Sequence, residues 1–95
     1  MTVKLKRWDV AEQLNTEEEM QLYLEACAEE DEGDGVMIRH ALANIARAKN
    51  MSELAKATGV SRRGLYKALS EDGNPSFALI LKLTRALGLR LKIAV

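Results

Sequence analysis

Four polar-tipped side chains in the second half of the chain are of types that bind nucleic acid. Arg62, Arg63, Tyr66 and Lys67 fall on one face of a short predicted helix. A helix in the major groove of DNA meets base edges with its N-terminal residues, and this helix begins with two arginines. The planar fork of an arginine can pair with both acceptors of guanine, a contact worth about 1–3 kcal/mol of discrimination. We therefore predict base contacts here; the alternative is solvated charge on a surface helix.

Two short helices and the turn between them must position these side chains. Ser52 is the expected N-cap of a first helix that ends at residue 58, and Ser61 is the expected N-cap of a second helix from Arg62 to about residue 70. Helices that cross steeply need a residue that tolerates positive φ at the corner, and Gly59 meets that need. The spacing predicts a helix-turn-helix over residues 52–69. Its apolar side chains are expected to face the core: Leu54, Val60, Leu65 and Leu69.

An acidic helix is predicted nearer the N-terminus. Thr16 and Glu19 form a capping box, which starts a helix over residues 17–31. A shorter helix could precede it, from Asp9 to Leu14. Apolar side chains follow the capping box at spacings of three and four and predict one buried stripe: Met20, Tyr23, Leu24, Cys27 and Ala28.

Two longer helices flank the predicted helix-turn-helix. Asp34 is the expected cap of the first, which ends near Asn50. Asn74 followed by Pro75 reads as the start of the second, and Gly88 terminates it. The first repeats apolar residues on one face: Ile38, Ala41, Leu42, Ile45 and Ala46.

The C-terminal part of the chain predicts self-association. Residues 89–95 alternate apolar and polar side chains, as a strand does, and need a pairing partner: residues 2–6, another protein or a second subunit. The helix over residues 75–87 is apolar almost all round, and it has more apolar side chains than the core of one small domain can bury. Two-fold symmetry would place two DNA-reading helices about 34 Å apart, matching a pseudo-palindromic operator. The expected homodimer interface includes Leu79, Leu83, Leu89, Leu91 and Ile93.

Charge is segregated along the chain. Residues 1–35 carry three basic and eleven acidic side chains, a net charge of −8, whereas residues 36–95 carry eleven basic and three acidic ones, a net charge of +8. The basic part could face phosphates and the acidic part a basic protein. The alternative is that the two parts neutralise one another, or that the acidic helix is only a solvated face.

Length and composition exclude other classes. The chain of 95 residues is one domain's length, and it has no run of 18 apolar residues that would span a membrane. Cys27 cannot form an internal disulfide, and no apolar stretch of signal-peptide length follows the first residues, so we expect a cytoplasmic protein. His40 has no second ligand at metal-binding spacing, and no phosphate loop or nucleophile motif occurs. We expect no enzyme, metal or cofactor.

The stretch from Ser52 to Leu69, SELAKATGVSRRGLYKAL, resembles the helix-turn-helix of lambda-repressor-like (Cro/cI-type) DNA-binding domains. The longer run through SEDGNPSF and on to ALGL is similar to the HigA-like addiction-module antidotes. Segments at residues 8–12, 23–26 and 45–48 agree with the same family, so the resemblance covers nearly the whole chain.

The resemblance implies a mainly α fold in a single domain over residues 1–95. The implied domain is a lambda-repressor-like five-helix fold, with an acidic helical extension (1–35), a helix-turn-helix core (36–88) and a short C-terminal β-strand (89–95). The implied function is that of an antitoxin in a type II toxin–antitoxin module. Such a protein binds double-stranded operator DNA as a dimer, represses its own transcription and neutralises a basic RelE/ParE-type toxin.

The resemblance also implies roles for single residues. Arg62, Arg63 and Lys67 fall where the family's recognition helix touches bases, and Tyr66 lies beside them. Gly64 departs from the family pattern: a glycine inside a helix costs about 1 kcal/mol of stability relative to alanine. It could allow the DNA backbone or the preceding helix to approach closely. The implied phosphate contacts are Ser52, Ser61, Asn74 and Ser76. The expected toxin contacts are Glu17, Glu18, Glu25 and Glu29.

Two other functions remain open at this point. One is a stand-alone, phage-type repressor without a toxin, in which the acidic helix only packs on the core. The other is a protein-interaction module that has kept the helical fold and lost DNA binding. Replacing Arg62 and Arg63 together separates this module from the DNA-binding functions.

Overall fold

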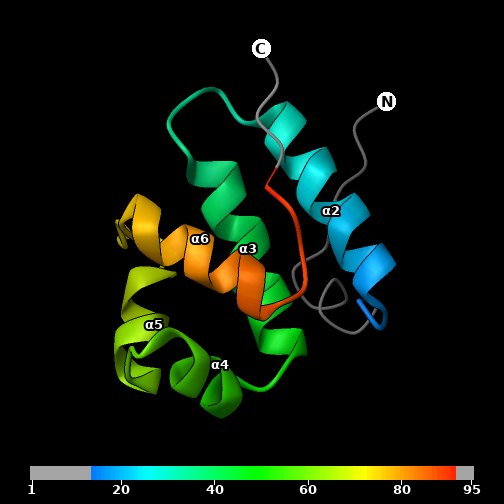
Figure 1. Ribbon diagram of the computed structural model, residues 1–95. Helices are drawn as coiled ribbons and strands as arrows, with labels where there is room; N and C mark the ends of the chain where they lie inside the picture. The colour runs from blue at the N-terminus through cyan, green and yellow to red at the C-terminus, as the bar shows by residue number, and fades with distance from the viewer. Residues whose placement is uncertain (1–13, 92–95) are drawn as a thin grey trace.

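The computed structural model describes residues 14–91, which form a mainly α fold with five helices and no strand within that range (Figure 1). In chain order the helices are α2 (Glu17–Glu30), α3 (Val36–Ala48), α4 (Met51–Thr58), α5 (Arg62–Ala68) and α6 (Phe77–Ala86). Helix α2 packs along α3, α6 packs against α4, and α4 and α5 form the lower end of the molecule in Figure 1. The helices predicted from the sequence within this range are all present.

Helix α2 begins at the predicted capping box. The Thr16 hydroxyl accepts from the Glu19 backbone N–H at 3.0 Å, and the Glu19 carboxylate accepts from the Thr16 N–H at 3.0 Å. Four residues of the predicted apolar stripe are buried on the side of α2 that packs against α3, with Leu24 and Cys27 at 1% and 2% exposure, and Ala28 is half-buried. Burial raises the pKa of the Cys27 thiol, as expected for a small core residue.

The cap predicted for α3 was wrong: Gly35, with φ +80°, is the N-cap in place of Asp34, and its position supplies no side-chain cap. Asp34 accepts one hydrogen bond, from the backbone N–H of Val36 at 3.0 Å. The Asp31 carboxylate stabilises both the loop and the first turn of α3. It accepts from four backbone N–H groups at 2.7–3.2 Å, those of Gly33 and Gly35 in the loop and of Met37 and Ile38 in the helix. The bonds from Gly35 and Gly33 are the largest causes of a lowered pKa for Asp31.

The cap predicted for α4 was wrong by two residues. Asn50, not Ser52, is the N-cap, and its Oδ1 accepts from the backbone N–H groups of Ser52 and Glu53 at 2.9 and 3.3 Å. Gly59 ends the helix in the left-handed region, with φ +77°, as the predicted turn requires.

The caps of the next two helices show one success and one error. Ser61 is the N-cap of α5, and its hydroxyl accepts from the Gly64 N–H at 3.0 Å, as predicted. Helix α6 begins later than predicted: Ser76 is its N-cap, in place of Asn74, and Pro75 lies before the helix. Gly88, with φ +74°, follows the last helical turn as expected.

The described part of the C-terminal segment, residues 89–91, forms hydrogen bonds with a side chain of α2. Gln21 on α2 donates from Nε2 to the Arg90 carbonyl at 3.0 Å, and its Oε1 accepts from the Arg90 N–H at 2.9 Å. One amide thus satisfies both backbone groups that a neighbouring strand would otherwise occupy. The rest of the predicted strand, the segment 2–6 and nearly all of the predicted helix at 9–14 lie outside the described residues.

Some residues predicted for a dimer interface are buried within the chain. Leu83 and Leu89, at 0% and 6% exposure, are buried within one chain and offer no surface to a second copy. Leu79 and Leu91 are half-buried, and Ile93 lies outside the described residues. The excess apolar surface of α6 lies elsewhere, at Phe77 and Leu81, which are 60% and 40% exposed.

Candidate nucleic-acid interface

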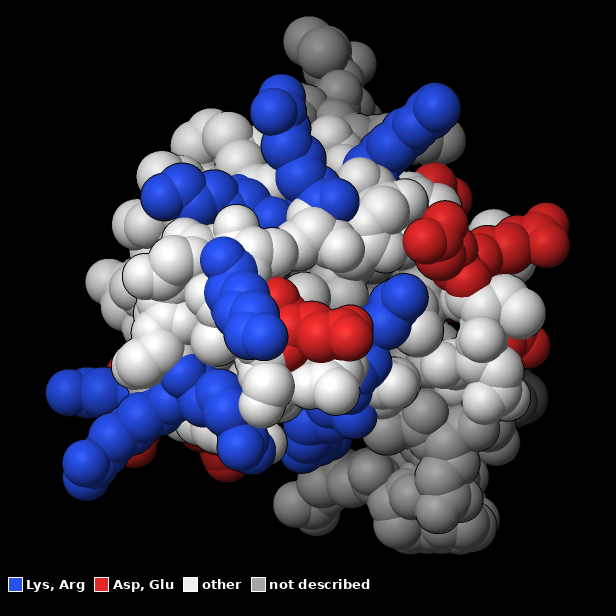
Figure 2. All heavy atoms as spheres, turned by 60° about the horizontal axis from the view of Figure 1, so that its bottom comes forward, with Lys and Arg blue, Asp and Glu red and all other residues white. Residues whose placement is uncertain are grey.

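Helix α5 presents the four predicted base-contact residues to solvent. Arg62, Arg63 and Lys67 are exposed and Tyr66 is 49% exposed, whereas Leu65 on the opposite side is completely buried. We call these four exposed side chains the basic face. Figure 2 brings the end of the molecule formed by α4 and α5 toward the viewer, and Lys and Arg side chains spread over it around one central acidic patch. The orientation agrees with the sequence prediction, while contact with DNA remains a prediction.

A groove runs beside the basic face where α3, α4 and α5 meet. Its volume is about 490 Å³. Arg47 and Lys49, which the sequence analysis did not single out, join Arg62 in this groove and make it strongly basic. We call it the basic groove; its lining residues are Arg47, Lys49, Asn50, Met51, Ser52, Arg62 and Tyr66. Arg47 and Lys49 come from the end of α3, before the helix-turn-helix motif, so the motif alone could not reveal them.

The predicted phosphate contacts occupy different places. Ser52 lines the basic groove beside Arg62. Ser61 and Ser76 are exposed, and each hydroxyl oxygen accepts the capping hydrogen bond of its helix. A capping hydroxyl keeps its own proton, which remains available to donate to an anion.

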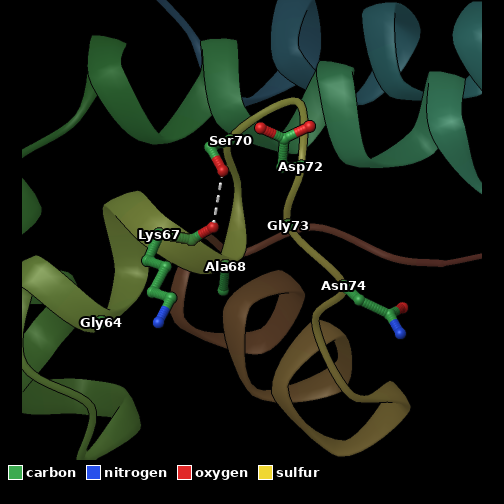
Figure 3. A pocket seen from close by; sticks show the side chains of 7 residues that line it. All are labelled: Gly64, Lys67, Ala68, Ser70, Asp72, Gly73 and Asn74. Atoms are coloured by element: carbon green, nitrogen blue, oxygen red, sulfur yellow. Dashed lines mark hydrogen bonds between the residues drawn. The ribbon is translucent and has the colours of Figure 1, made fainter.

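Asn74 is separate from this group. It lines a second depression, of about 300 Å³, on the other side of α5 together with Lys67, Ser70 and Asp72. Figure 3 shows Lys67 and Asn74 extending in different directions, so the structure does not bring them together on one ligand position. Asp72, a carboxylate, further disfavours an anion in this depression.

The turn itself accounts for Gly64. A Cβ at this position would lie 2.9 Å from Cγ1 of Val60 and 3.2 Å from the capping hydroxyl of Ser61. The glycine therefore gives room to the residues between α4 and α5 inside the chain. The close neighbours belong to the turn rather than to α4, and approach of the DNA backbone to Gly64 stays a prediction.

The predicted toxin contacts lie on α2. Glu17, Glu18 and Glu29 are exposed, and Glu25 is half-buried and accepts a hydrogen bond from Gln21 at 2.9 Å. Leu22, which the sequence analysis passed over, is 61% exposed and sits one helical turn from both Glu18 and Glu25. The outer side of α2 thus combines negative charge with an apolar side chain.

Comparisons with known proteins identify a family and a relative. The family model described as "Probable addiction module antidote protein" matches residues 4–95. A protein of Haemophilus influenzae (strain Rd), described only as uncharacterized, is 52% identical over 93 residues, which cover 98% of this chain and 94% of the relative. No solved structure matches the chain. No helix in residues 14–91 is long and apolar enough to cross a membrane.

Proposed function

The chain belongs to the family of probable addiction module antidote proteins, and from this premise we propose that it is a HigA-like antitoxin that also represses its own transcription. Membership of the family implies a toxin partner of some kind. The proposal adds that α4 and α5 form a lambda-repressor-like helix-turn-helix, with α5 as the helix that reads DNA, and that the toxin is of the RelE/ParE type.

The observation that carries the DNA-binding half is the exposure of the basic face above a buried Leu65. The two arginines stand at the N-terminal end of α5, the end that approaches base edges when a helix enters the major groove. The basic groove continues the positive surface beside them, and Ser52 is one of its lining residues. This arrangement fits base contacts by α5 flanked by phosphate contacts.

Fluorescence anisotropy tests the DNA-binding half. The probe is a labelled duplex taken from the DNA directly upstream of the protein's own reading frame, compared with a scrambled duplex of equal composition. We expect the wild-type protein to prefer the upstream duplex, and the Arg62→Ala/Arg63→Ala variant to lose at least about tenfold of that preference, since each bidentate contact contributes about 1–3 kcal/mol. The control Lys82→Ala/Arg85→Ala removes two exposed charges from α6. An unchanged preference in the first variant would contradict readout by α5.

The acidic side of α2 supports the toxin-binding half. Glu18 is exposed one helical turn before the exposed Leu22 and Glu29 two turns after it, so a basic partner surface with an apolar recess would complement them. The proposed division of labour is that α2 contributes to the toxin contact while α5 binds DNA.

Calorimetric titration with the product of the adjacent reading frame, if it encodes a short basic protein, tests this half. Reversing the charge of Glu18 and Glu29 to lysine is expected to weaken binding of that product by at least about tenfold and to leave folding intact, because both side chains are exposed. The control reverses Glu53 and Glu71, two exposed acidic residues outside α2. Equal affinity for the α2 variant and wild type would contradict the assignment.

A further inference from the structure

A chain of hydrogen bonds leads from α2 through the core to the basic groove. Its centre is Asn44 on α3, whose side chain is 2% exposed. The amide nitrogen of Asn44 donates to the hydroxyl oxygen of Tyr23 at 2.9 Å and lies 3.3 Å from Nε2 of His40. On its other side, the Asn44 oxygen accepts from Nη2 of Arg47. Every polar atom of this buried amide therefore has a partner, as burial requires.

Arg47 fixes which way the Asn44 amide faces, and Tyr23 holds the other end of the amide. Burial is the main cause that raises the pKa of Tyr23 to about 12, and the protonated hydroxyl can both accept and donate a hydrogen bond. Its oxygen offers an acceptor on the α2 side, and the NH₂ group of Asn44 turns toward it. The amide oxygen is then left for Arg47. The opposite rotation would place two N–H donors against a guanidinium that has only donors, so one arrangement satisfies all the groups.

Arg47 is the exposed end of this chain of hydrogen bonds. Its guanidinium carries five N–H donors and has others to offer besides the one directed at Asn44. The same side chain lines the basic groove with Ser52 and Arg62. A long side chain that is already held in place loses less conformational freedom on binding, which is worth about two- to tenfold in affinity.

We infer that Tyr23 and Asn44 are positioning residues, which hold the guanidinium of Arg47 in the basic groove so that it contacts a DNA phosphate. Helix α2 then contributes to DNA affinity without touching DNA. This inference rests on the proposed function, since it deepens the DNA-binding half.

A double-mutant cycle tests the inference with the upstream and scrambled duplexes, between about 50 and 200 mM salt. Arg47→Gln should weaken binding to both duplexes equally. It should also make the slope of log K against log salt shallower by about 0.9, the value for one phosphate contact. Tyr23→Phe keeps the ring and the arginine. Tyr23→Phe should lower the affinity for both duplexes by about two- to tenfold with an unchanged slope. In a protein that already carries Arg47→Gln, it should cause no further loss of affinity.

The control Leu24→Val removes one methylene from the neighbouring buried position of α2 and should lower Tm without changing DNA affinity. Circular dichroism establishes that each variant is folded. Tyr23→Phe acting equally in both backgrounds, or not at all, would overturn the inference. If Arg47→Gln changes neither affinity nor slope while Arg62→Ala/Arg63→Ala abolishes the preference, the inference falls and the proposed function stands. Failure of the wild-type protein to prefer the upstream duplex would overturn the proposed function itself.

Discussion

At the scale of single residues, the most consequential group outside the basic face is the Asp31 carboxylate. It accepts from four backbone N–H groups across the loop between α2 and α3. The sequence shows five acidic residues in or next to this loop, and only the folded geometry selects one of them as the loop's organiser. Local rules favoured Asp34 because it lies closer to the start of the helix.

The lowered pKa of Asp31 predicts a pH-dependent contribution to stability. The folded-state pKa lies below the ordinary value of 3.8, so the stabilisation is present above about pH 4 and is lost as pH falls through the folded pKa. Asp31→Asn should be less stable than wild type at pH 7, since its NH₂ group cannot accept from the N–H donors. The difference in the free energy of unfolding, measured in urea, should shrink below pH 4. The exposed neighbour Glu32→Gln serves as control, and a difference that stays constant down to pH 2 would contradict the assignment.

The cap of α4 gives a second prediction at this scale. Asn50→Ala should lower the free energy of unfolding by about 1 kcal/mol, because its Oδ1 accepts from two N–H groups that would lose their partner. Ser52→Ala should change it by less than about 0.5 kcal/mol, as an exposed residue inside the first helical turn. Thermal and urea unfolding of both variants gives the ranking, and the reverse order would restore Ser52 as the cap.

At the scale of elements, apolar spacing predicts the helices well and their starts less well. The stripes of α2 and α3 are buried as expected except at Ala28 and Ile38, which are half-buried, because one-sided burial depends on a periodicity that sequence displays directly. The errors at α4 and α6 are shifts between two cap-forming residues that stand two positions apart. Both members of each pair can cap, and only backbone geometry decides. The pairing of Gln21 with Arg90 joins residues 69 positions apart, so no local pattern could reveal it.

The loop between α5 and α6 is predicted to tolerate no side chain at Gly73. A Cβ there would collide with the carbonyl oxygen of Ala68 and lie 2.6 Å from that of Lys67. Since these are backbone atoms, the loop itself must move, and Gly73→Ala should lower the free energy of unfolding by about 1–3 kcal/mol. Chemical denaturation measures this, with Glu71→Ala as an exposed control in the same loop. Wild-type stability of Gly73→Ala would show that the loop has another conformation.

At the scale of the whole molecule, sequence reasoning found the basic face and missed the surface that extends it. A compact motif placed four side chains on α5, whereas Arg47 and Lys49 reach the same region from α3. Their proximity depends on how α3 packs against α4, which is a tertiary property. The sequence prediction also chose the wrong apolar residues of α6 as exposed, because the sequence of a helix that is apolar all round does not show which side faces the core.

Phe77 and Leu81 now replace Leu83 and Leu89 as the expected dimer contact. They lie one turn apart on α6 and are exposed. If the protein is a homodimer through this surface, Phe77→Ser/Leu81→Ser should shift it to monomers in sedimentation equilibrium and weaken operator binding. Leu22→Ser, an exposed leucine on α2, is the matched control and should weaken the toxin contact instead. Dimers that persist in the α6 variant would place the interface elsewhere.

The most direct measurement of the central claim is a titration of ¹⁵N-labelled protein with the upstream duplex, followed by NMR of the backbone amides. The account predicts that the largest shift changes fall at residues 47–52 and 61–67, around the basic groove and the basic face, with the outer side of α2 little affected. Changes concentrated on α2, or an absence of changes at saturating duplex, would contradict DNA recognition by α5.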